Sequence, residues 1–140
     1  MSIFTKAFTS FNVAIYRISR GRLGSKLGPQ SVLLLHSVGR KSGKAYATPV
    51  TYFSDGNNYL LVASNWGGEK NPDWYLNLLQ QKRTTIQVKD RTMPVEAHSV
   101  EGAEYDRLWQ LVTRQNAQYL QYQQKTPRRI PIVRLTPQMQ

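Results

Sequence analysis

Residues 47–63 read A-T-P-V-T-Y-F-S-D-G-N-N-Y-L-L-V-A, a pattern of strand, turn and strand on which the rest of the fold builds. Ala47 to Phe53 is rich in residues that favour strands, and Tyr59 to Ala63 is a second run of the same kind. Between them, Asp55-Gly56-Asn57-Asn58 is typical of a tight β-hairpin. The stretch therefore predicts a pair of neighbouring antiparallel strands.

Four further segments predict strands of the same sheet. Val32 to Leu35 is a short apolar run that precedes the hairpin. Thr84 to Val88 alternates and leads through a turn into its partner, Thr92 to Ala97. Ile130 to Leu135 is the last strand. The chain is therefore expected to hold about six strands, joined mainly by hairpins.

Helices interrupt these strands. Asn71 is a good N-cap and Pro72 suits the first helical position, so one helix is expected to begin there. A second is expected to begin near Ser99, and a third, short one carries Tyr119 and Tyr122.

The order of elements predicts a mainly β protein with added helices. Strands and helices do not alternate as βαβ units, which disfavours a parallel doubly wound sheet. A split β-barrel of the FMN-binding kind, with inserted helices and an N-terminal amphipathic helix, fits best. We expect residues 29–140 to form this barrel domain and residues 1–28 to form the helix and a linker.

Residues 3–19 predict the N-terminal amphipathic helix, because apolar side chains recur every three or four positions. Two interpretations stay open. The helix packs on its own domain or on a partner subunit, or it lies on an anionic membrane surface. The apolar stripe consists of Phe4, Phe8, Phe11, Ile15 and Ile18, and the opposite face carries Lys6, Arg17 and Arg20.

Charge and composition limit the function. The chain of 140 residues has a net charge of +11, with no carboxylate before Asp55 or after Asp106, which indicates an anionic partner. It has no cysteine, and its two histidines, His36 and His98, lie far apart, so no metal site is expected. No apolar run is long enough to span a bilayer and no secretory signal is present, so we expect a cytoplasmic protein, or one bound peripherally at the inner face of the membrane.

The basic turn, Gly39-Arg40-Lys41-Ser42-Gly43-Lys44, is the main candidate for an anion site. Three cations that repel one another are not needed to reverse a chain. The spacing is one residue too short for a P-loop, and Ala45 stands where the magnesium-binding hydroxyl belongs. The turn therefore suits a phosphodiester or carboxylate group held at a barrel rim. A solvated basic turn is the alternative.

Two other segments can contribute to a site. Ala63-Ser64-Asn65-Trp66-Gly67-Gly68 ends a strand with two glycines, so it is either a place where a flat ligand can approach the backbone or an ordinary strand-to-helix loop. Tyr119 and Tyr122 share a helix face, so they either pack in a core or donate a proton. The sequence offers no Ser/His/Asp triad and no pair of carboxylates that would serve hydrolysis. If the protein is an enzyme, a bound organic cofactor is therefore expected to carry out the chemical step.

Three segments resemble the deazaflavin-dependent nitroreductases, a family also described as F420H2-dependent quinone reductases. The first is the basic turn followed by T-P-V-T-Y at 48–52. The second is A-S-N-W-G-G-E-K-N-P-D-W-Y-L-N-L at 63–78. The third is Y-L-Q-Y-Q-Q-K-T-x-R-x-I-P-I-V at 119–133. Together they span about the last three-quarters of the chain.

The resemblance implies a split barrel that binds coenzyme F420 and passes a hydride from its reduced form to a quinone, a nitroaromatic or a similar acceptor. It implies that the basic turn holds the coenzyme's phosphate and acidic tail. The resemblance implies catalytic roles for Ser64, Tyr119 and Tyr122, and coenzyme contacts from Arg40, Lys41, Ser42, Gly43, Lys44, Pro49, Val50, Thr51, Ala63, Ser64, Asn65 and Tyr119.

The chain departs from that family at two positions. Thr51 and Asn116 stand where members often have pocket tyrosines, so nitroreduction does not follow from the resemblance. Two alternatives remain: a split-barrel oxidoreductase that uses FMN, and a non-catalytic basic module that binds a cofactor or a membrane. FMN lacks a long acidic tail, so the basic turn argues against it. A nucleic-acid partner is disfavoured, and both a monomer and a homodimer remain open.

Overall fold

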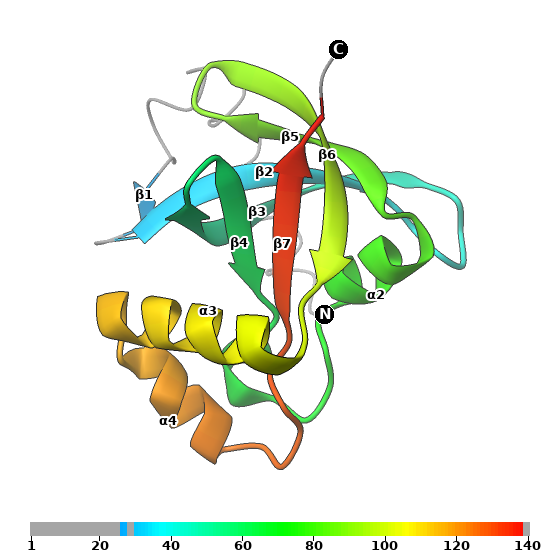
Figure 1. Cartoon of the computed structure of the whole chain (residues 1–140). Helices are drawn as coiled ribbons and strands as arrows, with labels where there is room; N and C mark the ends of the chain where they lie inside the picture. The colour runs from blue at the N-terminus through cyan, green and yellow to red at the C-terminus, as the bar shows by residue number, and fades with distance from the viewer. Residues whose placement is uncertain (1–25, 28–29, 139–140) are drawn as a thin grey trace.

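The computed structural model describes residues 26–27 and 30–138. Within these ranges the chain forms one antiparallel sheet of seven strands, four helical segments and their connections (Figure 1). The N-terminal helix expected over residues 3–19 lies outside the described residues. The elements are β1 (Lys26–Leu27), β2 (Gln30–Val38), β3 (Ala45–Asp55), β4 (Asn58–Val62), η1 (Asn65–Gly67), α2 (Asp73–Gln80), β5 (Arg83–Val88), β6 (Arg91–Ser99), α3 (Gly102–Gln115), α4 (Gln118–Gln124) and β7 (Ile132–Pro137).

The sheet closes on itself and confirms the predicted barrel. Its order is β1-β2-β3-β4-β7-β6-β5, and β2 also pairs with β5, so six strands from β2 to β7 form the ring. The closing pairs are Leu34 with Gln87 and Leu35 with Ile86. Closure removes most exposed strand edges. The two-residue strand β1, which the sequence did not predict, pairs only with the start of β2.

The predicted hairpin is present between β3 and β4. Its last pair is Asp55 with Asn58, and Gly56 has a φ of 60°, a left-handed conformation that glycine adopts without a steric penalty. Arg107 of α3 donates to both carboxylate oxygens of Asp55, at 2.9 and 3.2 Å. This pair ties α3 to the hairpin, and its hydrogen bond holds the pKa of Asp55 below its usual range.

Side chains alternate along the strands between two hydrophobic cores. One fills the barrel, where Leu61 of β4 and Val133 of β7 meet Tyr75 and Leu78 of α2. The other lies on the outside of the sheet, where Leu60 and its neighbours meet α3 and α4. Figure 1 shows α3 and α4 together at one end of the barrel and α2 on a different side. Helix α2 thus plugs the barrel, while α3 and α4 cover part of its outer face.

One helix begins one residue later than expected. Pro72, not Asn71, is the N-cap of α2: it has extended backbone angles, and its carbonyl accepts from the N–H of Tyr75 at 3.1 Å. The side chain of Asn71 instead contacts Arg128: its oxygen accepts a hydrogen bond from that guanidinium at 2.7 Å. No helix in the described ranges combines the length and apolarity that crossing a bilayer requires.

Candidate functional site

The basic turn closes the hairpin between β2 and β3. The N–H of Gly39 donates to the carbonyl of Lys44 at 2.8 Å, and the N–H of Gly43 donates to the carbonyl of Gly39 at 2.9 Å. Gly43 has a φ of 73°. The main-chain N–H of Lys44 donates to Ser42 Oγ at 3.2 Å, so that hydroxyl oxygen also organises the loop. The turn is a compact hairpin loop built from its own hydrogen bonds.

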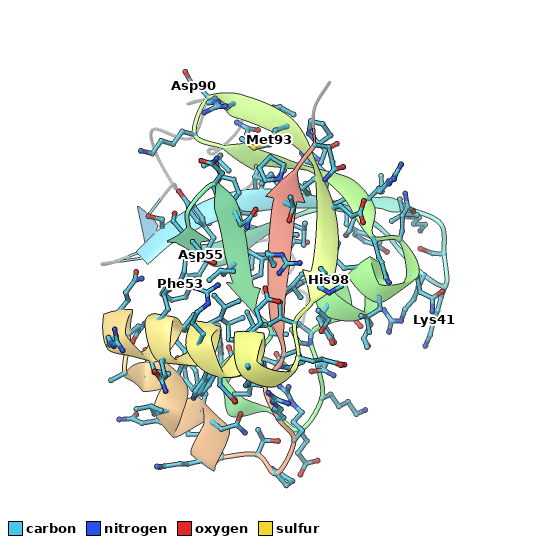
Figure 2. The ribbon with its side chains drawn as sticks, in the orientation of Figure 1. Lys41, Phe53, Asp55, Asp90, Met93 and His98 are labelled. Carbon is cyan, nitrogen blue, oxygen red and sulfur yellow. The ribbon has the colours of Figure 1, made fainter. Side chains whose placement is uncertain are left out.

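The three cations of this turn have different surroundings. Lys41 and Lys44 are exposed, and within the described residues neither ammonium group forms an ion pair. Figure 2 shows Lys41 at the outer tip of the turn, pointing away from the barrel. Two unpaired lysines at one loop raise the local positive potential, so this loop suits an anionic ligand.

Arg40 instead fastens the turn to α2. Its Nη1 donates to Asn77 Oδ1 at 2.9 Å, its main-chain N–H donates to the same oxygen at 3.1 Å, and its Nη2 lies 3.3 Å from Asp73. The side chain of Arg40 is only 24% exposed. Arg40 thus holds the loop in place, and the lysines are the cations that face solvent.

Strand β3 has an open edge between this turn and the rest of the barrel. From Ala45 to Tyr52 it pairs with β2, whereas its pairing with β4 covers only Tyr52 to Asp55. No other strand of the described ranges pairs with the free edge of 45–51. The seven steps from Lys44 to Thr51 extend about 23 Å at the usual rise of a strand. This edge is long enough to lie beside an elongated ligand.

The β3 residues that were predicted to contact a cofactor lie on both faces of the strand. Val50 points into the barrel core and is 9% exposed, so only its backbone is available to a ligand. Pro49 and Thr51 are half-buried on the opposite face, which is also the face of Phe53 in the outer core.

The chain after β4 forms the other side of this split. The N–H of Ala63 donates to the carbonyl of Pro131 at 2.9 Å, so the chain stays beside the segment before β7, whereas its pairing with β3 ends at Leu61. Residues 63–71, which we call the ring loop, then lead into α2. Because α2 is bound to Arg40, the open edge is bounded at one end by the pairing of Tyr52 with Leu61 and at the other by the contact of Arg40 with Asn77.

The ring loop has an unusual backbone. Three consecutive residues are left-handed: Asn65 with a φ of 46°, Trp66 with 55° and Gly67 with 83°. The left-handed region is costly for a bulky side chain such as that of Trp66, and such strain persists only where the surrounding structure holds it. Residues held in this way cluster at functional sites.

Ser64 precedes this turn and is 7% exposed. Its carbonyl accepts hydrogen bonds from Gly67 and Arg128, but its hydroxyl has no partner among the described residues. Within the described ranges, Ser37 Oγ is the one fully buried side-chain oxygen or nitrogen without a partner, so the oxygen of Ser64 is not sealed from solvent. The Ser64 hydroxyl is therefore accessible to a ligand that binds beside the ring loop.

The two tyrosines lie on α4, which contacts η1. A Cβ added to Gly67 would lie 2.9 Å from the carbonyl oxygen of Tyr122, so α4 packs directly on the ring loop. Tyr119 is 7% exposed in the outer core, with edge-to-face contacts to the rings of Phe53 at 5.7 Å and Tyr122 at 5.5 Å. Tyr122 is half-buried.

Tyr119 therefore combines core packing with a phenol that remains protonated. Burial, with a smaller contribution from Tyr122, raises the pKa of Tyr119 to about 12. Its hydroxyl has no partner among the described residues. At neutral pH this group is a hydrogen-bond donor.

Sequence reasoning missed Arg128, which is the side chain most engaged with the ring loop. Its guanidinium donates to the carbonyls of Ala63, Ser64 and Gly68 at 3.2, 2.9 and 3.0 Å, and to Asn71 Oδ1 at 2.7 Å. The sequence signal was its place in the third segment, 119–133, where it stood among other basic residues. Nothing in its spacing distinguished it from a surface cation.

The structure thus brings together the ring loop, α4 and the segment that carries Arg128. It places the basic turn at the other end of the open β3 edge. Asn116, at a position where a pocket tyrosine occurs in the resembling family, forms a turn just before α4: its Oδ1 accepts from the N–H of Gln118 at 3.0 Å.

Comparison with known proteins identifies the family of this chain. The family described as F420H(2)-dependent quinone reductase matches residues 9–137. The chain is 42% identical over 127 residues to F420H(2)-dependent quinone reductase Rv1261c of Mycobacterium tuberculosis (strain ATCC 25618 / H37Rv), an alignment that covers 88% of this chain and 85% of that protein.

Two solved structures are also similar. One is described as an F420-H2 dependent reductase (FDR-A); it is 32% identical, with a TM-score of 0.68 over 74% of this chain and 92% of that chain. The other is described as a domain-swapped dimer; it is 29% identical, with a TM-score of 0.70 over 89% of this chain and 96% of that chain.

Proposed function

The chain belongs to the F420H2-dependent quinone reductase family, and on that basis we propose which of its residues bind the coenzyme and support the reaction. It is an oxidoreductase with reduced F420 as its reductant and a quinone as its acceptor. Reduced F420 supplies the hydride when it is bound. The protein's own part is binding, orientation and exclusion of water.

The open edge of β3 is the observation that carries the assignment of residues. It extends from a loop with two unpaired lysines to a buried serine whose hydroxyl has no partner in the described ranges. F420 has a planar ring at one end and a phosphodiester with an acidic tail at the other, so its chemistry fits these two ends. FMN lacks the long acidic tail that would reach the lysines.

We assign the tail to the basic turn. The ammonium groups of Lys41 and Lys44 bind the anionic tail, while Arg40 fixes the loop to α2 and Ser42 and Gly43 shape it. The guanidinium of Arg40 still has N–H groups beyond those it gives to Asn77 and Asp73, so it can support the same anion.

We assign the ring to the other end of the split. Ser64 donates its free hydroxyl, the backbone of Ala63 and Asn65 borders the ring, and Pro49, Val50 and Thr51 line the strand beside it. Tyr119 and Tyr122 orient the acceptor, and Tyr119 can donate a hydrogen bond because it stays protonated. These placements bring an acceptor within hydride distance and limit water at the reacting atoms.

One titration tests the coenzyme assignment. The purified protein is mixed with F420 or with FMN, and the ring fluorescence of each is followed. We expect saturable binding of F420 and weaker binding of FMN. Binding of FMN with equal or greater affinity would show that the assignment of the tail to the basic turn is wrong. Turnover of a naphthoquinone with reduced F420 is measured in parallel.

Nitroaromatic acceptors are a finer part of the proposal. Thr51 and Asn116 are smaller than the tyrosines common at these positions, so we propose that this chain prefers quinones to nitroaromatics. The comparison of kcat/KM for a naphthoquinone and a nitroimidazole tests this preference. A higher value for the nitroimidazole would contradict it.

Residues 1–28 are proposed to form an amphipathic helix and a linker that joins the barrel domain of residues 29–140, with β1 as its point of contact with the sheet. The helix is proposed to pack on its own domain or on a partner subunit, or to bind an anionic membrane. A relative that forms a domain-swapped dimer makes self-association reasonable. Co-sedimentation with anionic liposomes and light scattering, each with the full chain and with a variant lacking residues 1–21, separate self-association from membrane binding. Liposome binding by the full chain alone supports the membrane role.

A further inference from the structure

The left-handed run from Asn65 to Gly67 needs an external support. Trp66 is 82% exposed, so packing of its indole does not hold its backbone. Bonds within the loop contribute: Asn65 Nδ2 donates to the carbonyl of Lys70 at 3.0 Å, and Gly68 donates to the carbonyl of Asn65 at 2.9 Å. These bonds connect the loop to itself, and they do not attach it to the barrel.

Arg128 attaches both ends of the run to the rest of the protein. Its guanidinium binds the carbonyls of Ala63 and Ser64 before the left-handed residues, and it binds Gly68 and Asn71 after them. A planar fork with donors in fixed directions can bridge two ends of a loop in this way.

The segment around Arg128 is itself fixed to α4. Gln123 donates to the carbonyl of Arg128 at 2.7 Å and accepts from the N–H of Ile130 at 2.9 Å. The side chain of Tyr119, on the same helix, packs in the outer core. The loop, Arg128 and the tyrosine helix are therefore mechanically connected.

Arg128 has little capacity left for a ligand. A guanidinium has five N–H donors, and the four hydrogen bonds of Arg128 use four of them. No carboxylate of the described residues lies within ion-pair distance of it. Its bonding pattern is that of a residue that shapes a backbone, in contrast to the unpaired lysines of the basic turn.

We propose that Arg128 is a positioning residue of this active site: it holds the ring loop in its left-handed form and so keeps Ser64 in place for the coenzyme. This inference rests on the proposed function, since it assumes that the coenzyme ring binds at the ring loop. Loss of Arg128 frees the loop to relax to right-handed backbone angles, which moves Ser64.

The test compares Arg128→Ala and Arg128→Lys with the matched pair Arg129→Ala and Arg129→Lys. Arg129 is the adjacent residue, but it stacks on Tyr105 and lies 3.9 Å from Asp106, away from the ring loop. Each variant is first checked for its unfolding midpoint. Arg128→Lys keeps the charge and most of the aliphatic stem, so it remains informative even if Arg128→Ala does not fold.

Native trypsin digestion reports on the loop without any coenzyme, because Lys70 is exposed within it. We expect cleavage after Lys70 to be faster in both Arg128 variants than in wild type, and unchanged in the Arg129 variants. Unchanged cleavage in the Arg128 variants would overturn the proposal. Since this readout needs no F420, it decides the role of Arg128 even if F420 binding itself fails.

Coenzyme titration gives the functional readout. Charge-assisted hydrogen bonds of this kind are strong enough that we expect F420 affinity to fall about 10-fold or more in Arg128→Ala. Added guanidinium ion, at low millimolar concentration, should restore part of the affinity in Arg128→Ala and none in Arg129→Ala. Wild-type affinity in Arg128→Ala would also overturn the proposal.

Discussion

Arg40 and Asn77 join the basic turn to α2, with Arg40 Nη1 and the Arg40 main-chain N–H sharing Asn77 Oδ1 at 2.9 and 3.1 Å. Asn77 is 7% exposed, and within the described residues its side-chain oxygen Oδ1 accepts from no donor other than these two of Arg40. One amide side chain thus fixes the position of a six-residue loop, and it does so from inside the helix that plugs the barrel.

Asn77→Ala is expected to lower the free energy of unfolding by about 1–3 kcal/mol, because it leaves the donors of Arg40 without their acceptor at a partly buried site. Urea unfolding measures this. In a double-mutant cycle with Arg40→Ala, the two effects should not add, because both remove the same contact. Full additivity would mean that the contact contributes nothing to stability.

Lys41→Glu combined with Lys44→Glu is expected to lower F420 affinity strongly and to change the free energy of unfolding by less than about 0.5 kcal/mol, because both side chains are exposed. Fluorescence titration measures the affinity, and the wild-type value should fall with rising salt. This pair is a cleaner test than one that includes Arg40, which also holds the turn on α2.

The control for the lysine pair is Arg91→Glu with Arg114→Glu, which changes the net charge by the same amount at exposed positions away from the turn. We expect this control to bind F420 nearly as wild type does. If both double variants lose affinity equally, the overall charge, and not the basic turn, attracts the coenzyme.

Tyr119 is expected to affect stability at alkaline pH. Burial raises its pKa in the folded protein to about 12, above the ordinary value of 10.0. Its contribution to stability is therefore complete below pH 10 and is lost as the pH rises toward 12, because the unfolded tyrosine ionises first. Urea unfolding between pH 8.5 and 11.5 should show a weaker loss in Tyr119→Phe than in wild type.

The same pKa predicts no ionisation of Tyr119 in the pH profile of catalysis. Between pH 6 and pH 10 the phenol stays protonated, so kcat/KM for the quinone should show no step that disappears in Tyr119→Phe. A step near pH 8 that is absent from this variant would mean that the phenol titrates far below the value that its burial indicates.

Trp66→Gly is expected to keep or raise stability, even though it removes a large side chain. The indole is 82% exposed and contributes little packing, whereas its left-handed backbone costs about 1–2 kcal/mol for a residue with a Cβ. Trp66→Ala keeps the Cβ and serves as the control. Urea unfolding should find the glycine variant more stable than the alanine variant by about 1 kcal/mol.

Local sequence determined the barrel strands and the hairpin that contains Gly56. Alternation of apolar residues and the Asp-Gly-Asn-Asn turn are properties of neighbouring residues, so they can be read before any contact is known. The same is true of the basic turn, whose three cations and two glycines lie within six residues. The three segments in their order also identified the family.

Only the tertiary structure decided which basic residues hold the backbone in place and which are exposed to a ligand. Arg40, Lys41 and Lys44 look equivalent in the sequence. In the structure Arg40 forms a hydrogen bond with Asn77, 37 residues away, whereas the two lysines are exposed. Arg128 looks like another surface cation until the chain brings it to carbonyls more than 50 residues away. Hydrogen bonds between segments far apart in the sequence leave no local pattern in it. The open edge of β3, the left-handed ring loop and the contacts of Arg128 all depend on such pairing, so only the folded barrel defines them.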